Sequence, residues 1–336
     1  MTAPPPFDAV LFDLDGTLVA TERFWPDAAR LGARRAFAEL AIERPLPSTA
    51  DWMGLVGLPT TEGFDGLFPE LSEGDRRHVQ RRCIEAEEEL LRDGRAAPLP
   101  GVVETLGSLR ADGVWIGVAS NCGRRYLAAM MDGLGLARWV HEARCLDSAG
   151  IGTKADMVAD LLGTFGTRSA VMVGDRRGDR DAGWANGLPH VHLARGYAAT
   201  GEVVEAEATI DGMDDLEGVL DRRTELLRAI LGALVPGPAE PIAVDGPPGA
   251  GATLLARDLM RAAEVAGRSP RVVDGPGDGS GRLVWVDAEE EVRRRRVGAT
   301  RTAAGRPEPA RRPDLRVDLT NLLDPRLDPP LDPGPA

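Results

Sequence analysis

Lysine is almost absent from this chain of 336 residues: all but one of its 40 basic residues are arginine, and the exception is Lys154. An arginine presents a wide planar guanidinium, whereas a lysine presents a compact ammonium that behaves as a point charge. A composition that uses arginine everywhere else indicates that Lys154 occupies a position where only an ammonium serves. We therefore expect a chemical role for this residue if the groups that it would serve are also present.

Basic charge, cysteine and long apolar runs are scarce as well. The formal net charge of −13 argues against a dedicated binder of nucleic acid or of an anionic membrane. Cys83, Cys122 and Cys145 have neither disulfide-framework nor metal-site spacing, so they fit reduced thiols. No apolar run is long enough to cross a bilayer, and residues 1–10 lack the features of a secretion signal. These absences predict a cytoplasmic protein.

The residues that are present predict an α/β protein with a parallel sheet. With 43% hydrophobic residues, the chain is long enough for two globular domains with cores of their own. Short apolar runs alternate with amphipathic stretches, a pattern typical of a doubly wound, Rossmann-like sheet covered by helices. The expected strands are Ala9–Leu14, Val114–Ala119, Ala170–Gly174 and His190–Ala194.

Composition divides the chain into a core, an insertion and a C-terminal segment. Residues 21–98 are too many for a single crossover and rich in helix-forming residues, which predicts an inserted helical cap. The expected parts are a core at 7–20 and 99–225, the cap at 21–98, a Pro/Gly-rich linker at 235–241, a small α/β segment at 242–322 and a tail at 323–336. The tail has too few apolar residues to fold, which predicts disorder.

Two acidic side chains follow the first expected strand, in the sequence Phe12-Asp13-Leu14-Asp15-Gly16. Residues at i and i+2 leave a strand on the same side, and the glycine permits a tight turn that aims both carboxylates at one point. Paired carboxylates suit magnesium. They also suit a division of labour in which one attacks phosphorus while the other protonates the leaving oxygen and then activates water. For these two acids alone, a strand that simply ends in an Asp-Gly turn is the alternative.

Further polar groups follow the other expected strands. Ser120 and Asn121 come after the second one, where a hydroxyl and backbone amides can hold a phosphoryl oxygen. Lys154 opens a helix-like segment, and its charge can neutralise both a phosphate and an attacking acid. Asp175 and Asp179 follow a later strand and can supply more carboxylates to a metal. Because the ends of parallel strands face one crevice, we expect these groups to meet there.

In order and spacing, these motifs resemble those of the haloacid dehalogenase superfamily of phosphohydrolases, over about Phe7–Arg223. The resemblance implies that Asp13 is the nucleophile that becomes an aspartyl phosphate, and that Asp15 is the general acid and base. It also implies that Ser120 and Lys154 bind the phosphoryl group. The inserted helices would then form a mobile cap that excludes water other than the catalytic one.

The same resemblance implies a Mg²⁺ cofactor. Its ligands would be Asp13, the backbone carbonyl of Asp15, and Asp175, with Asp179 supporting them. Members of the superfamily that cleave carbon–halogen bonds lack the second acid of the first motif, so Asp15 favours phosphoryl transfer. Residues 21–98 contain no lysine, which argues against the branch that uses a cap lysine as a Schiff base.

The predicted function is hydrolysis of a small phosphorylated metabolite, with a phosphoglycolate-phosphatase-like activity as the nearest analogue. A sugar-phosphate mutase is left open, because mutases of this fold share all four motifs. The superfamily often carries an aspartate where Ala20 stands, which leaves the identity of the substrate open. Gly54–Pro59 resembles the substrate-facing loop of the cap, although an ordinary turn between helices is the alternative.

The C-terminal segment resembles a phosphate-binding P-loop of the uridine-kinase type. Ile242–Asp245 predicts a strand, which Gly246 and Gly251 follow before Thr253 at the start of a helix. Ala252 stands where such a loop carries its lysine, and without that charge phosphoryl transfer from ATP would be badly impaired. We interpret the loop as a degenerate remnant, with a plain glycine-rich turn or a working kinase as alternatives. Weak nucleotide binding would make the protein a nucleotide-sensing regulator, the alternative function.

Overall fold

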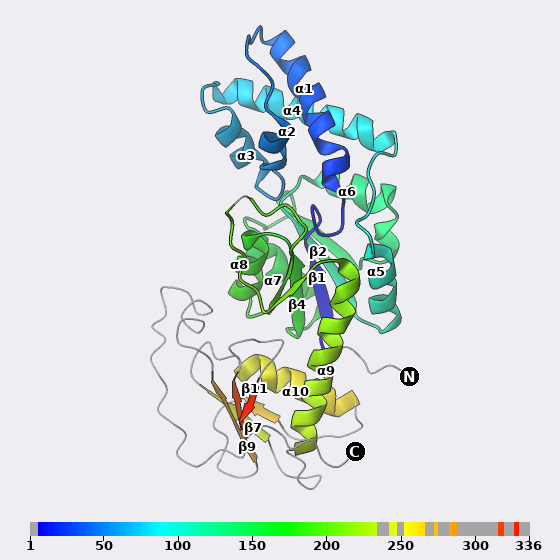
Figure 1. Cartoon of the computed structure of the whole chain (residues 1–336), viewed down its shortest axis with the longest axis vertical. Helices are drawn as coiled ribbons and strands as arrows, with labels where there is room; N and C mark the ends of the chain where they lie inside the picture. The colour runs from blue at the N-terminus through cyan, green and yellow to red at the C-terminus, as the bar shows by residue number, and fades with distance from the viewer. Residues whose placement is uncertain are drawn as a thin grey trace.

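The computed structural model describes residues 6–199, 201–233, 242–246, 252–265, 272–274, 282–287, 315–318 and 326–328. Along the longest axis, a helical cap, a core with a central sheet and a C-terminal segment follow one another (Figure 1). No helix within these ranges is long and apolar enough to span a membrane. The expected linker at 235–241 lies outside the described residues.

The core contains a six-stranded sheet in the order β3-β2-β1-β4-β5-β6, in which all neighbouring strands run parallel. Its strands are β1 (Ala9–Phe12), β2 (Trp115–Ser120), β3 (Glu142–Cys145), β4 (Ala170–Gly174), β5 (His190–Leu193) and β6 (Ala208–Ile210). Strand β1 lies between β2 and β4, so the strand order reverses beside it. Such a reversal opens a crevice at the carboxyl ends of the strands.

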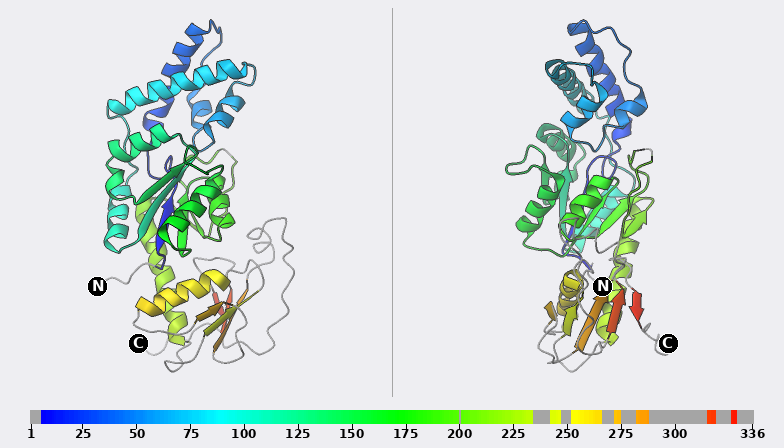
Figure 2. Two further views of the ribbon diagram at one scale, coloured as in Figure 1. Left: turned by 180° about the vertical axis from the view of Figure 1, so that it is seen from behind. Right: turned by 90° about the vertical axis from the view of Figure 1, so that its left-hand side faces the viewer.

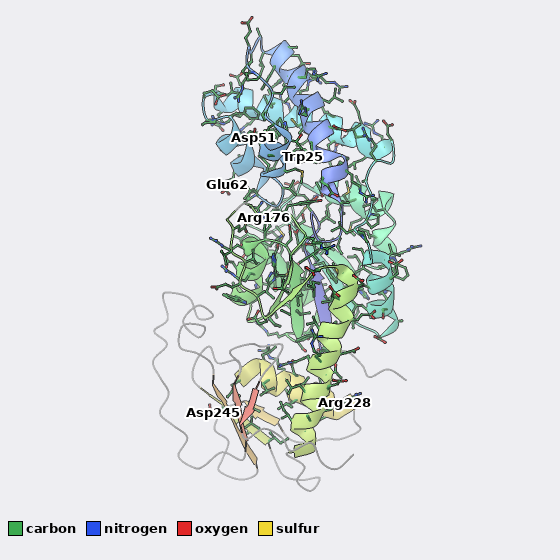
Figure 3. All side chains as sticks on the ribbon, in the orientation of Figure 1. Trp25, Asp51, Glu62, Arg176, Arg228 and Asp245 are labelled. Atoms are coloured by element: carbon green, nitrogen blue, oxygen red, sulfur yellow. The ribbon has the colours of Figure 1, made fainter. Side chains whose placement is uncertain are left out.

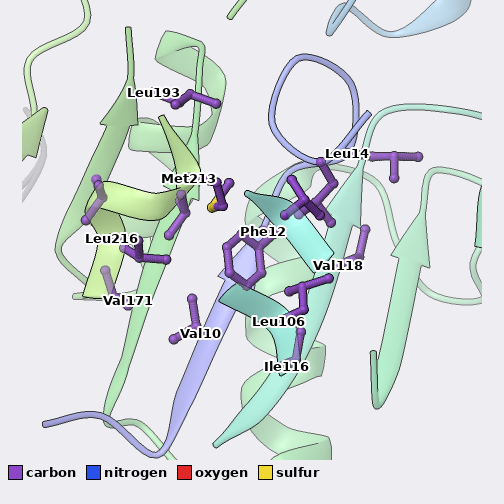
Figure 4. Packing of buried hydrophobic residues seen from close by; sticks show 14 of the residues in the cluster. Val10, Phe12, Leu14, Leu106, Ile116, Val118, Val171, Leu193, Met213 and Leu216 are labelled. Carbon is purple, nitrogen blue, oxygen red and sulfur yellow. The ribbon is translucent and has the colours of Figure 1, made fainter. Parts of the chain in front are cut away.

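Alternate residues of β1 face opposite sides of the sheet, as the two-residue period of a strand requires. Val10 and Phe12 pack in the larger hydrophobic cluster together with Leu106 (Figure 4). Leu11 packs on the other side with Met157. All five side chains are fully buried, so the sheet is apolar on both faces and its strands read as continuous hydrophobic runs.

Helices cover both faces of this sheet. Side chains of α7 and α8 join the smaller cluster, whereas those of α5, α6 and α9 join the larger one. The helices of the core are α5 (Val102–Ala111), α6 (Arg124–Gly133), η2 (Leu136–Arg138), α7 (Lys154–Phe165), α8 (Arg177–Ala185), η3 (Met213–Asp215) and α9 (Leu216–Ala233). The core is therefore a three-layer α/β sandwich whose upper rim faces the cap (Figure 1).

The insertion between β1 and β2 is helical and stands over one end of the sheet (Figure 2). Its helices are η1 (Thr21–Arg23), α1 (Trp25–Glu39), α2 (Thr49–Met53), α3 (Thr60–Leu67) and α4 (Glu73–Arg92). Rings of Trp52, Phe64 and Phe68 lie about 6 Å apart, between 5.9 and 6.2 Å from centre to centre, and form an aromatic core. These rings belong to the same larger hydrophobic cluster as Val10 and Phe12 of the sheet, so the apolar interior of the cap is continuous with that of the core.

The described parts of the C-terminal segment form a second sheet in the order β11-β10-β9-β7-β8, packed against α10 (Ala252–Val265). Its strands are β7 (Ile242–Asp245), β8 (Val272–Asp274), β9 (Arg282–Asp287), β10 (Leu315–Asp318) and β11 (Arg326–Asp328). Of the predicted P-loop, Gly246 is described, whereas Gly251 and the side chain of Thr253 lie outside the described residues. Nothing in the described part supports nucleotide binding.

One of these strands differs from what composition predicts. β11 lies inside 323–336, where no folded structure is expected, and it pairs antiparallel with β10. Backbone hydrogen bonds between strands do not require apolar side chains, so composition does not reveal such a pair. The remainder of 323–336 lies outside the described residues.

A buried ion pair joins the C-terminal segment to the core. The Arg223 guanidinium of α9 donates to the Asp258 carboxylate of α10 at 2.6 Å, and both side chains are fully buried. Ser169, directly before β4, donates to the other oxygen of Asp258 at 3.3 Å. This junction lies at the amino ends of the core strands, away from the cap (Figure 1).

The prediction of a parallel, Rossmann-like α/β core is confirmed, and each of the four expected strands has a counterpart in the sheet. Strands β3 and β6 were not expected. Only Cys145 of β3 is buried, and only Ile210 of β6, because both strands lie at the edges of the sheet. Neither strand therefore carries a continuous apolar run.

Candidate active site

Three buried aspartates meet at the carboxyl end of the sheet. Asp13 directly follows β1, Asp175 directly follows β4, and Asp179 lies in the first turn of α8. One carboxylate oxygen of each lies within 4.8 Å of the others. Neighbouring parallel strands bring Asp13 and Asp175 together, and the turn into α8 brings Asp179 back over them.

The ammonium of Lys154 stands among these carboxylates. Its Nζ donates to Oδ1 of Asp13 at 2.5 Å and to Oδ1 of Asp179 at 2.6 Å. Lys154 is the first residue of α7, whose start is fixed by a capping box between Thr153 and Asp156. The chain's only lysine is therefore placed by a helix terminus and pairs with two buried acids.

Asp15 lies apart from this cluster and has different partners. The hydroxyls of Thr21 and Tyr126 both donate to its Oδ1, at 2.7 and 2.5 Å. Directly after the second acid of the motif, the chain turns at Gly16, which has a φ of 82°. A Cβ on this glycine would lie 2.6 Å from Oδ2 of Asp175, so no larger residue fits between the two loops.

Burial dominates the electrostatics of these acids. It raises the pKa of Asp13 well above the usual range; Lys154 opposes this shift, and Asp179 and Asp175 add to it. Burial and the charge of Asp179 raise the pKa of Asp175 to about 7. Burial lowers the pKa of Lys154, but Asp13 and Asp179 outweigh it and hold that pKa above its ordinary value. A single ammonium therefore leaves the three carboxylates under-compensated.

The donor set fits a divalent cation. The clustered groups are carboxylate oxygens, which are the ligands that hard cations such as Mg²⁺ prefer. Like charges crowded into a buried space cost free energy, and a bound cation would remove this cost. Asp13, Asp175 and Asp179 thus form a cluster able to hold a metal.

Ser120 and Asn121 lie at the end of β2 but have different partners. Ser120 is buried, and its Oγ accepts the backbone N–H of Cys122 at 3.3 Å. The side-chain amide of Asn121 donates to the backbone carbonyl of Gly57 in the cap at 3.0 Å. The Asn121 side chain is thus directed to the cap, so only its backbone is available for the predicted phosphate-binding role.

A cavity of about 370 Å³ lies between cap and core. Asp15 and Ser120 line it from the core, and residues 55–59 of the predicted cap loop line it from above. Gly57 in this loop has a φ of 83°, and a Cβ there would lie 2.6 Å from Cδ of Arg176. The loop therefore lines the cavity and, at Gly57, packs closely against Arg176 of the core.

Two further residues hold the cap against the core. The Arg176 guanidinium donates to the backbone carbonyl of Val56 and pairs with Glu202 at 3.0 Å, and Figure 3 shows it where the core meets the cap. The Tyr197 hydroxyl donates to the carboxylate of Glu22. Arg176 directly follows Asp175. The residue that bonds to the cap loop is therefore the chain neighbour of a member of the carboxylate cluster.

Comparison with known proteins agrees with this geometry. Residues 7–187 match the haloacid dehalogenase-like hydrolases. The chain belongs to this family. The resemblance of the motifs is thereby confirmed at the level of the family.

Curated relatives indicate the type of reaction. The hydrolase is 29% identical over 221 residues to a phosphoglycolate phosphatase of Agrobacterium fabrum, covering 63% of this chain and 91% of the relative. It is 30% identical over 235 residues to a phosphoglycolate phosphatase of Pseudomonas savastanoi, covering 65% of this chain and 82% of the relative. The chain is thus a phosphoric monoester hydrolase.

Solved structures show the same fold. A predicted phosphoglycolate phosphatase from Haemophilus somnus superposes with a TM-score of 0.56 at 22% identity, covering 64% of this chain and 98% of that one. CbbY from Rhodobacter sphaeroides, solved in complex with phosphate, superposes with a TM-score of 0.53 at 19% identity, covering 62% of this chain and 96% of that one. At these identities the likeness is one of fold.

Sequence reasoning missed several residues of this hydrolase that contact its site. Thr21, Tyr126 and Tyr197 are single hydroxyl-bearing residues outside any motif, and Glu87 is one of several glutamates in α4. The sequence does contain a signal for Tyr126. This residue lies in the first turn of α6, the helix that follows Ser120, so it lies at the same end of the sheet as Ser120. The others depend on how the cap packs.

Proposed function

We propose that this hydrolase is a Mg²⁺-dependent phosphatase that acts on a small phosphorylated metabolite through an aspartyl-phosphate intermediate. The observation that carries the proposal is the set of three buried carboxylates within 4.8 Å of one another beside a buried ammonium. A separate carboxyl group, that of Asp15, lines the adjoining cavity. A nucleophile, a counter-charge, a metal-holding set and a proton donor are thus available in one place.

Asp13 is the proposed nucleophile. Its backbone N–H donates to the carbonyl of Val173 at 2.9 Å, which fixes the residue at the end of β1. Its Oδ1 accepts from Lys154, which leaves Oδ2 to attack phosphorus. As the bond from Oδ2 to phosphorus forms, the bond from phosphorus to the ester oxygen breaks. Ser120 and the backbone amides after β2 hold the phosphoryl oxygens meanwhile.

Asp15 is the proposed acid and base. Burial raises its pKa, and the hydrogen bonds from Tyr126 and Thr21 oppose this shift. Because both hydroxyls donate to Oδ1, the proton is carried on Oδ2. Oδ2 gives this proton to the leaving oxygen and then takes one from the water that attacks the aspartyl phosphate. Phosphorus then separates from Asp13 as inorganic phosphate.

Asp13, Asp175 and Asp179, together with the backbone carbonyl of Asp15, would hold Mg²⁺. When bound, the ion would supply positive charge to the carboxylates and to the transferring phosphoryl group. The remaining cavity of about 370 Å³ suits a small metabolite. The phosphoglycolate phosphatases among the curated relatives support this class of substrate.

Phosphate release tests the proposal. The full chain is incubated with p-nitrophenyl phosphate and with a panel of phosphorylated metabolites, with Mg²⁺ or with a chelator. We expect release of inorganic phosphate with Mg²⁺ and little release in the chelated sample. A mutase, the alternative of the same fold, would isomerise a sugar phosphate and release little inorganic phosphate. Absence of phosphate release from every ester would contradict the proposal.

A further inference from the structure

The cap contributes one buried carboxyl group to the substrate cavity. Glu87 lies on α4, lines the cavity and is only 8% exposed. Among the described residues, its side chain has no hydrogen-bond or ion-pair partner, although the neighbouring Glu88 pairs with Arg125 at 2.9 Å. A buried carboxyl group without a partner is costly, so a residue of this kind is typical of a position that a ligand completes.

The cationic residues of the cavity are already engaged. Arg125 pairs with Glu88, and its side chain is 81% exposed. The guanidinium of Arg124 donates to the backbone carbonyl of Asp147, whose carboxylate accepts the backbone N–H of Arg124 at 2.8 Å. The charged lining residues from core and cap are Asp15, Glu87, Arg124, Arg125 and Asp147, so acids outnumber bases. The lining is therefore not built to receive a second anionic group.

Glu87 lines the same cavity as Asp15, the proposed proton donor of the reaction, and Tyr126. Its charge acts on the pKa of Tyr126, whose hydroxyl bonds to Asp15, and the charge of Asp15 in turn adds to the raised pKa of Glu87. The leaving oxygen must reach Asp15 to be protonated. The atoms attached to that oxygen are then the part of the substrate nearest to Glu87.

We propose that Glu87 selects phosphate monoesters whose leaving group carries a hydrogen-bond donor, a hydroxyl or an ammonium, near the ester oxygen, and discriminates against a carboxylate there. The inference rests on the proposed phosphatase function. A donor on the substrate supplies the hydrogen-bond partner that the Glu87 carboxyl group lacks. A carboxylate on the substrate instead lies beside Glu87, so that two acids are buried together. Phosphoglycolate is the substrate in the names of the curated relatives. In this compound a single carbon separates the ester oxygen from the carboxylate.

A matched series of two-carbon esters tests the selection. Hydroxyethyl phosphate, aminoethyl phosphate and phosphoglycolate differ only in the terminal group, and p-nitrophenyl phosphate reports the phosphatase activity itself. With the full chain and Mg²⁺, we expect kcat/KM for at least one of the two donor-bearing esters to exceed that for phosphoglycolate by about tenfold or more. The difference is expected mainly in KM, because it concerns binding of the leaving group.

The variant Glu87→Gln removes the ionisable acid and keeps the shape. We expect the ratio of kcat/KM between the preferred donor-bearing ester and phosphoglycolate to fall by about tenfold, because the amide of the variant cannot ionise and can donate a hydrogen bond to the substrate carboxylate. Glu85→Gln is the matched control on the same helix, since Glu85 is half exposed and pairs with Arg82 at 2.7 Å. We expect the wild-type ratio in that control. A thermal melt of both variants checks that they fold.

The outcomes separate this inference from the proposed function. Hydrolysis of p-nitrophenyl phosphate together with equal or better hydrolysis of phosphoglycolate overturns the selection by Glu87 and leaves the phosphatase intact. An unchanged ratio in folded Glu87→Gln also overturns it. If the wild-type chain hydrolyses none of the four esters, the proposed function fails and the inference fails with it. The comparison of substrates on the wild-type chain requires no variant to fold.

Discussion

Two groups of buried charges in this protein are compensated differently. At the junction with the C-terminal segment, one guanidinium, that of Arg223, meets one carboxylate, that of Asp258, and both side chains are fully buried. At the candidate active site, a single ammonium, that of Lys154, pairs with two of three clustered carboxylates. The junction is balanced within the chain, whereas the site carries more negative charge than the described residues neutralise.

This difference distinguishes a structural ion pair from a site that binds ligands. Burial raises the pKa of Asp258, and Arg223 opposes the shift, so one cation faces one anion, although Nε and Nη1 of Arg223 have no hydrogen-bond partner among the described residues. At the site, burial and neighbouring acids together raise the pKa of Asp175 to about 7. An unpaired excess of buried charge is stable only with a counter-ion or with protons. The balanced pair therefore joins two parts of the fold, and the excess of acids in the cluster supports the proposed metal site.

The largest effect is expected from Asp13→Asn. The amide keeps the shape of the side chain but is a poor nucleophile, so phosphate release from p-nitrophenyl phosphate should fall by at least about 10³-fold. Steady-state assays with Mg²⁺ measure the loss. Because one charge leaves the crowded cluster, the variant should melt at or above the wild-type temperature. Persistent turnover would show that another residue attacks phosphorus.

Lys154→Arg should have the next largest effect. The guanidinium keeps the positive charge but cannot place a compact ammonium between Asp13 and Asp179, and we expect kcat to fall by about 10²-fold or more. Arg177→Lys, at an exposed position of α8, is the control that exchanges the same two residue types in the opposite direction. A near-normal kcat in Lys154→Arg would refute the role inferred from the composition.

Breaking the junction should affect stability and leave catalysis alone. Arg223→Ala leaves Asp258 buried without its partner and should lower the free energy of unfolding by about 3–5 kcal/mol. Chemical denaturation measures this change. The double variant Arg223→Met with Asp258→Leu removes both charges and should recover most of the loss. A large drop in kcat for folded Arg223→Ala would show that the junction is coupled to the active site.

The smallest effect concerns pH and the metal-free protein. The pKa of Asp175 is about 7 in the folded chain, whereas an unperturbed aspartate has a pKa of about 3.8. Between these values the folded state holds a proton that the unfolded state lacks, so this group makes stability decrease as pH rises toward 7. We expect the melting temperature of the chelated protein to fall by a few degrees over this range, and less so in Asp175→Asn. Mg²⁺ should reverse the decrease at pH 8 in the wild type alone.

The sequence was sufficient for the part of the site that depends on strand ends. Asp13, Ser120 and Asp175 each follow a short apolar run, and parallel strands present their carboxyl ends to one crevice. Lys154 was conspicuous because no other lysine exists in the chain. Local periodicity and the geometry of parallel sheets therefore predict the fold and the meeting of these groups without knowledge of any long-range contact.

The tertiary structure alone decided which cap residues face the reaction. Glu87 is one of three consecutive glutamates in α4, and nothing local distinguishes it from Glu88 or from Glu89, which pairs with Arg35. Which of these glutamates faces the cavity depends on how α4 is oriented over the sheet. The same holds for Arg223 and Asp258, which are 35 residues apart in the sequence. Contacts between separately folded layers arise from packing, and a one-dimensional pattern carries no record of which helix faces meet.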